Sequence, residues 1–130
     1  MTAKRKAGER ILKELDPDAL QTMINALAPV APDMPRLIAE FAFGEIYARP
    51  ALDLRSRQLA TVAALAALGA AGQLKPHLKS ALRVGWSRDE LVEVLMQMAL
   101  YGGFPASLTA LAVAKEAFAE IDSSAHGPSA

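Results

Sequence analysis

The sequence predicts an all-α fold, a single-domain bundle of about six helices. Apolar residues recur at three- and four-residue spacing, no segment alternates apolar and polar residues as a half-buried strand does, and Pro, Gly or Asp stands at the breaks. A length of 130 residues is usual for one domain. We therefore expect one domain over 1–130, with an ordered core at about 8–121 and a disordered tail at 122–130.

The first predicted helix covers about 4–15 and is amphipathic, with a largely charged outer face. Asp16 is a candidate N-cap for the next helix, with Pro17 at its first position. The stretch 28–35 contains three prolines, which forbid a continuous helix and indicate a connector.

A longer helix is predicted to follow and to stop before Pro50, because an apolar stripe recurs along it at helical spacing. Asp53 can cap the helix after it. The body of that helix, 59–72, carries no charge, so we expect it to be the buried central helix. It is too short and too poorly flanked to span a bilayer, which needs about 18 apolar residues.

Three further segments complete the predicted bundle. An amphipathic helix over 73–84 has Pro76 in its first turn. The sequence Ser87-Arg88-Asp89-Glu90 is a capping box, and its helix ends at Gly102-Gly103. The last helix is rich in Ala and Leu and covers about 104–121.

Composition excludes several classes of function. The 14 basic and 14 acidic residues cancel without forming a basic face, so no nucleic-acid partner is expected. There is no cysteine and there are only two histidines, so neither a disulfide nor a metal site is expected. The amino-terminal residues form no signal peptide or membrane anchor, so we expect a cytoplasmic protein without a membrane partner.

Four blocks of the chain, taken in order, resemble the carboxymuconolactone decarboxylase family: GEIYARPAL, RSRQLATVAALAALG, GQLKPHLKSALRVGWSRDELVEVL and ALYGGFPA. The resemblance extends from about Gly8 to Phe118. It implies the helical fold of that family, a cofactor-free enzyme and a homo-oligomer, commonly a hexamer built as a trimer of dimers. The 52% hydrophobic content, rich in small residues, agrees with burial between subunits.

The family has a peroxidase branch that uses a C-x-x-C-x-x-x-H motif, and this chain departs from it. With the motif's histidine aligned on His77, the cysteine positions hold Ala70 and Gln73. Neither side chain can form a thiolate, which excludes thiol peroxidase chemistry. Where the peroxidase branch often has a glutamate, this chain has Gln58. The resemblance thus implies the cysteine-free branch, whose decarboxylases act on 4-carboxymuconolactone in aromatic catabolism.

Within that branch the pattern places histidines where this chain has Phe41 and Gln97, and asparagine where it has Leu108. The leading hypothesis is a carboxy-lyase for a small anionic lactone or cyclic acid. The changed positions keep open a related isomerase or cyclase for an enolisable substrate. A non-catalytic oligomeric binding protein is the third possibility.

Decarboxylation of such a lactone needs a cation for substrate carboxylates, a donor to the developing oxyanion and a proton source. His77 is a candidate donor, because the pKa of histidine lies near neutrality; its structural alternative is a packed histidine bonded to the backbone. Arg57 is a candidate cation in an otherwise apolar helix, with an ion pair at a subunit contact as its alternative.

The remaining candidates lie on two helix faces. Arg49 and Glu45 are four residues apart, so they form either a mutual ion pair, which we favour, or part of a substrate site. Glu93, Gln97 and Tyr101 form a polar line at four-residue intervals. Tyr101 is a candidate catalytic residue and the other two are candidate substrate contacts; a core ring and subunit contacts are their alternatives.

Overall fold

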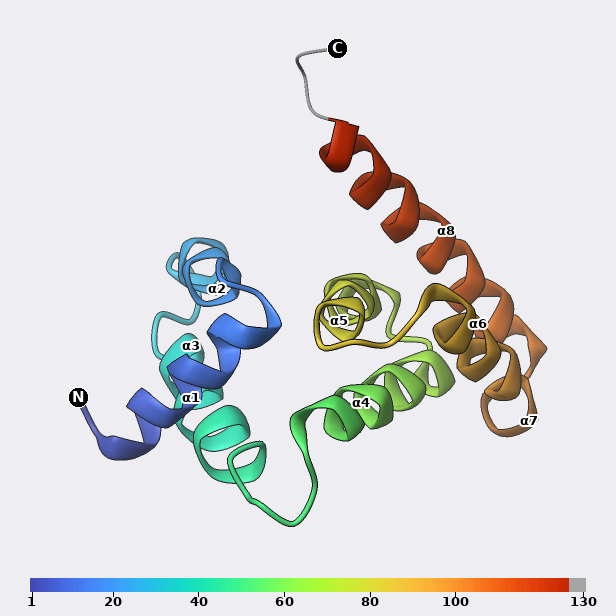
Figure 1. Cartoon of the computed structure of the whole chain (residues 1–130). Coiled ribbons are helices and arrows are strands. Elements are labelled where there is room, and N and C mark those ends of the chain that lie inside the picture. The colour runs from blue at the N-terminus through green and yellow to red at the C-terminus, as the bar shows by residue number, and fades with distance from the viewer. Residues whose placement is uncertain (127–130) are drawn as a thin grey trace. The chain divides into compact units, whose positions relative to one another are not determined.

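The structure is a computed structural model that describes the backbone from Met1 to His126 and the side chains through Ala125. The described residues form helices and connecting turns with no strand, which confirms the predicted all-α class. The helices are α1 (Ala3–Leu15), α2 (Ala19–Leu27), α3 (Met34–Leu37), η1 (Ile38–Ile46), α4 (Leu54–Leu68), α5 (Ala71–Arg83), α6 (Arg88–Gln97), α7 (Ala99–Gly102) and α8 (Phe104–His126) (Figure 1). They belong to two compact units, Met1–Arg57 and the chain from Gln58 onward, which are described separately below.

The first unit is organised around a close contact between α1 and η1, in which two glycines allow the backbones to touch. A Cβ atom on Gly8 would lie 1.8 Å from the carbonyl oxygen of Ala39. A Cβ on Gly44 would lie 2.2 Å from the carbonyl oxygen of Lys4. Around this contact the side chains of Leu12 and Phe43 are buried. Only glycine leaves room for two helices at this separation.

The helix predicted before Pro50 is mostly a π-helix, with its hydrogen bonds closed over five residues. One such bond runs from the Tyr47 amide to the Ala42 carbonyl at 2.9 Å. Each turn is therefore wider than a turn of an α-helix. Tyr47 still packs against Phe43, four residues before it, with ring centroids 4.7 Å apart.

Two helix starts differ from the prediction. Helix α2 begins at Ala19, because Pro17 and Asp18 form a turn in which the Asp18 amide donates to the Asp16 carboxylate at 3.0 Å. Helix α5 begins at Ala71, so Pro76 is its sixth residue rather than part of its first turn. Pro76 therefore lacks the amide that would bond the carbonyl four residues before it.

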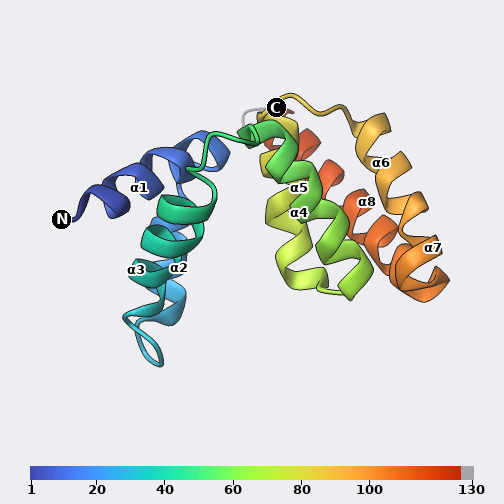
Figure 2. The ribbon, with the colours of Figure 1, turned by 90° about the horizontal axis from the view of Figure 1, so that it is seen from below.

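The second unit has a continuous apolar core. Helix α6 lies beside α8 in both ribbon views (Figures 1 and 2). The core residues are all nearly or fully buried: Val62, Ala66, Leu74, Leu78, Ala81, Leu91, Leu95, Ala110, Val113 and Ala114. Helix α4 contributes one stripe to this core and exposes its other side, Leu68 by 79%. The burial predicted for 59–72 therefore holds for this stripe and not for the side that carries Leu68.

The end of α8 is held by ion pairs, which explains why the helix continues to His126 where a disordered tail was predicted. Arg88 donates two hydrogen bonds to the Asp122 carboxylate, at 2.6 and 3.2 Å, and its guanidinium lies 4.9 Å from the Phe118 ring centroid. Two residues earlier in α8, Glu120 lies 2.9 Å from Lys75. Residues 127–130 of the predicted tail lie outside the described part of the chain.

The capping box predicted at the start of α6 is present. The Glu90 amide donates to the Ser87 hydroxyl and the Ser87 amide to the Glu90 carboxylate, both at 3.0 Å. We expect Ser87→Ala to lower the free energy of unfolding by about 1 kcal/mol, because the Glu90 amide loses its acceptor. Urea denaturation measures this. Ser123→Ala, an exposed position of α8, is the control, and an equal loss in both variants would contradict the prediction.

Between Met1 and His126 no helix is both long enough and apolar enough to cross a membrane.

Candidate active site

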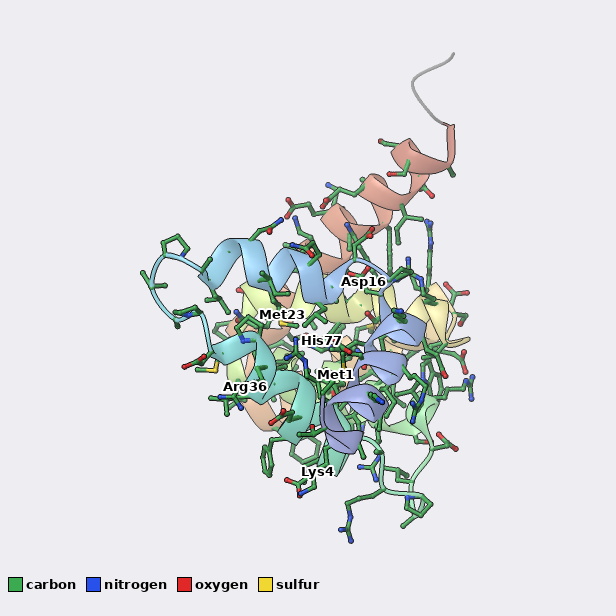
Figure 3. The ribbon with its side chains drawn as sticks, turned by 90° about the vertical axis from the view of Figure 1, so that its left-hand side faces the viewer. Met1, Lys4, Asp16, Met23, Arg36 and His77 are labelled. Carbon is green, nitrogen blue, oxygen red and sulfur yellow. The ribbon has the colours of Figure 1, made fainter. Side chains whose placement is uncertain are left out.

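His77 lies on α5 and is held by Gln58 of α4, both within the second unit. The Gln58 side-chain nitrogen is 2.8 Å from His77 Nδ1 and 3.1 Å from the His77 carbonyl oxygen. Gln58 is fully buried, and it heads the buried stripe that continues through Val62 and Ala66. Figure 3 labels His77, which is half-buried. Burial lowers the pKa of His77 below its usual value, because desolvation disfavours the charged ring.

The other ring nitrogen of His77, Nε2, makes no hydrogen bond to a residue of the described chain. It is the nitrogen that remains for a ligand. The side-chain oxygen of Gln58 is likewise buried without a partner in the described chain. Buried polar atoms without partners are uncommon in native proteins, and a catalytic role is one of the explanations for them.

The guanidinium of Arg57 binds two backbone carbonyls of the first unit. Its Nε donates to the Leu52 carbonyl and its Nη2 to the Arg49 carbonyl, both at 3.1 Å. These bonds fix the turn that leads from η1 into α4. Asp53 caps α4 as predicted, accepting a 2.6 Å hydrogen bond from the Ser56 amide, and this bond lowers the pKa of Asp53.

The ion pair favoured between Glu45 and Arg49 does not form. Glu45 instead contacts Lys4 of α1, with 2.5 Å between the Nζ atom and the carboxylate oxygen. Arg49 lies beyond the end of η1 at Ile46, so the two residues do not share a helix. Figure 3 labels Lys4 and Arg36, which respectively pair with Glu45 and Glu40 of η1.

Arg49 is exposed and lines an open cleft of about 410 Å³ in the first unit. The other lining residues also come from η1 and the turn after it: Phe41, Gly44, Glu45, Ile46 and Ala48. His77 is not part of this cleft. Arg49 and Glu45 therefore both line this cleft without pairing with each other, and Glu45 pairs with Lys4.

The polar line Glu93, Gln97 and Tyr101 is exposed on α6 and α7, with Tyr101 exposed by 75%. A turn at Met98 separates the two helices, which the sequence predicted as one. Exposure removes the alternative of a core ring for Tyr101. The structure shows no contact between Tyr101 and His77, so their joint action stays a prediction.

Sequence reasoning singled out His77 and missed the role of its partner Gln58. The periodicity held a signal, since Gln58 is the polar residue of the stripe that includes Val62 and Ala66. Nothing local predicted which buried group it would meet, because His77 is 19 residues away. No group of three potential metal ligands occurs in the described residues.

Comparison with known proteins identifies relatives. A model described as carboxymuconolactone decarboxylase family matches residues 32–116. A 4-carboxymuconolactone decarboxylase of Acinetobacter baylyi is 39% identical over 89 residues, which are 68% of this chain and 66% of that protein, just under two thirds of its length.

Two more distant relatives also match. An uncharacterized 15.0 kDa protein of Paracoccus denitrificans is 30% identical over 119 residues, 90% of this chain and 89% of its own. Nitrosuccinic acid decarboxylase of Metarhizium robertsii is 31% identical over 80 residues, 62% of this chain and 56% of its own. The family model covers most of the chain, and the chain has no cysteine for the peroxidase chemistry. The protein therefore belongs to the carboxymuconolactone decarboxylase family, to its cysteine-free part.

Proposed function

We propose that this protein is a cofactor-free carboxy-lyase for a small anionic substrate such as 4-carboxymuconolactone, and that His77 donates a hydrogen bond to the reacting group. The observation that supports this proposal most strongly is the environment of His77. Its Nδ1 is occupied by the buried Gln58, burial lowers its pKa, and Nε2 remains for a ligand. A neutral, oriented N–H donor suits the stabilisation of a developing oxyanion.

The named relatives indicate what such a donor would do. One is named for 4-carboxymuconolactone and another for nitrosuccinic acid, and both substrates contain a group that can accept an electron pair, a lactone or a nitro group. As the carbon–carbon bond to the leaving carboxylate breaks, carbon dioxide departs and the electron pair moves to an oxygen of that group. His77 would stabilise this oxyanion, and a proton derived from water would then restore the C–H bond.

Incubation of the purified chain with 4-carboxymuconolactone and, separately, with nitrosuccinate tests the proposal. We expect carbon dioxide release in step with loss of the absorbance of at least one compound. Succinate is the control substrate, because it has two carboxylates but no comparable electron acceptor. Absence of turnover above the uncatalysed rate with both compounds would reject the carboxy-lyase. Conversion without carbon dioxide would favour the isomerase or cyclase.

The low pKa of His77 predicts the pH profile of this reaction. If the neutral ring is the active form, turnover should stay constant from about pH 8 to about pH 6.5, the ordinary pKa of histidine. It should fall only at lower pH, as the pH passes through the lowered pKa of His77. Initial rates across this range measure the profile, with His126→Asn as the control for the second histidine. A loss of activity above pH 6.5 would contradict the prediction.

We also propose that the protein is a homo-oligomer, a hexamer in the form that the family resemblance implies. Several large apolar side chains are exposed by 65% or more where α4 ends and where α7 leads into α8; they are Leu68, Leu100, Tyr101, Phe104 and Leu108. We call these residues the apolar patch. Such groups on a small protein mark interaction surfaces.

Light scattering tests the assembly. We expect a mass of six copies of the 13.8 kDa chain, and dissociation by Phe104→Glu, which places a charge in the apolar patch. Val30→Glu changes an equally exposed residue outside the patch and should leave the mass unchanged. A monomeric protein would refute the proposal, and equal dissociation by both variants would refute the location.

A further inference from the structure

The orientation of the Gln58 amide can be assigned from the fixed groups around it. A backbone carbonyl has no proton to give, so the atom of Gln58 that lies 3.1 Å from the His77 carbonyl must be the nitrogen donor. With the amide reversed, two oxygens would face each other at that distance. The amide nitrogen would also move to the buried position where the side-chain oxygen now lies without a partner. The reversed amide would thus leave two buried N–H donors without partners, whereas the present orientation leaves one oxygen acceptor without a partner.

This assignment also determines the proton on the histidine ring. The same Gln58 nitrogen lies 2.8 Å from His77 Nδ1. Because that nitrogen donates, Nδ1 has to accept and carries no proton. The neutral ring then holds its proton on Nε2.

Protonation of both ring nitrogens is opposed by the same contact. A proton on Nδ1 would face an N–H of the Gln58 amide at a donor–donor distance of 2.8 Å. Gln58 could relieve this only by turning its oxygen toward the His77 carbonyl. Since Gln58 is fully buried, water does not offer an alternative partner.

We infer that Gln58 is a positioning residue that keeps His77 in the neutral form with its proton on Nε2, so that the ring serves as an N–H donor and not as a charged acid. The inference rests on the proposed function for what Nε2 does, while the location of the proton stands on the geometry alone. A glutamate at position 58 would have the opposite effect on the ring. A carboxylate accepts only, and it would draw a proton onto Nδ1.

Nitrogen-15 NMR of the imidazole rings tests the location of the proton. The chain has only two histidines, so a His126→Asn background leaves a single ring to observe. With Gln58 present, we expect His77 to have an unprotonated Nδ1 and a protonated Nε2 at neutral pH. Gln58→Glu should move the proton to Nδ1 or yield the doubly protonated ring, and it should shift the midpoint of the His77 titration upward. Gln97→Glu adds the same charge on the exposed side of α6 and should leave the His77 signals unchanged.

Turnover of Gln58→Glu should fall by about tenfold or more, as for other residues that orient a functional imidazole. Gln58→Met keeps the length of the side chain without its hydrogen bonds, and it should allow both neutral forms of the ring with a smaller loss of turnover. Its folding can be checked by circular dichroism.

The outcomes separate the two proposals. A protonated Nδ1 in the wild-type protein, or His77 signals that Gln58→Glu leaves unchanged, would overturn the role of Gln58, even if the enzyme decarboxylates its substrate. The expected ring form without turnover of any substrate would overturn the carboxy-lyase and leave the location of the proton intact.

Discussion

His77→Ala should lower turnover by about 100-fold or more while the fold is retained, because alanine removes the N–H donor that faces the developing oxyanion. The loss should appear mainly in kcat, with KM little changed, since an interaction made in the transition state contributes little to binding of the substrate. Steady-state kinetics with the substrate found in the carbon dioxide assay measure both constants.

Lys79→Ala is the matched control for this variant. Lys79 lies on the same helix, and its Nζ atom is 3.3 Å from Glu120 on the surface of the second unit. It should retain the wild-type rate. A wild-type rate in His77→Ala would assign His77 a structural role and leave the decarboxylation, if observed, to other residues.

Gly8→Ala is expected to have the largest effect on stability, lowering the free energy of unfolding by about 3 kcal/mol, at the upper end for overpacked sites. The added Cβ would lie 1.8 Å from the Ala39 carbonyl oxygen and 2.8 Å from its carbon. Both are backbone atoms, so no side-chain rotation relieves the contact. Helices α1 and η1 would have to separate, which would expose the apolar residues between them.

Chemical denaturation of Gly8→Ala and Gly72→Ala makes the comparison. A Cβ on Gly72 meets no atom within 4 Å, and Gly72 is the second residue of α5. Alanine there should leave stability unchanged or raise it by about 0.5–1 kcal/mol, since a helical glycine loses more conformational entropy on folding. Equal midpoints for the two variants would show that the close contact is absent in solution.

The elements that the sequence predicted correctly depend on local signals. The capping box at Ser87 and the cap at Asp53 each satisfy amides a few residues away. The later end of α8 depends on a distant contact, because Asp122 pairs with Arg88, 34 residues away. The π-helix was not predicted, because its apolar residues recur at the same spacing as in an α-helix.

The candidate site shows the same division. Residue type and family pattern selected His77, but its partner Gln58 depends on the packing of α4 against α5. Glu45 illustrates the reverse error, because helical spacing predicted a local partner and the structure gives it Lys4, 41 residues away. The chain divides into two compact units, and the assignment of both to a single domain stays a prediction.

The Gln58 amide binds two atoms of one residue, the ring and the carbonyl of His77, and thereby links the imidazole to its own backbone. Rotation of the ring would break one of the two bonds, so the imidazole has few orientations available before any substrate arrives. Immobilising a free side chain on binding costs about 0.5–1.5 kcal/mol. Here that entropy is already lost when the protein folds, and a ligand that reaches Nε2 meets a donor that is already aimed.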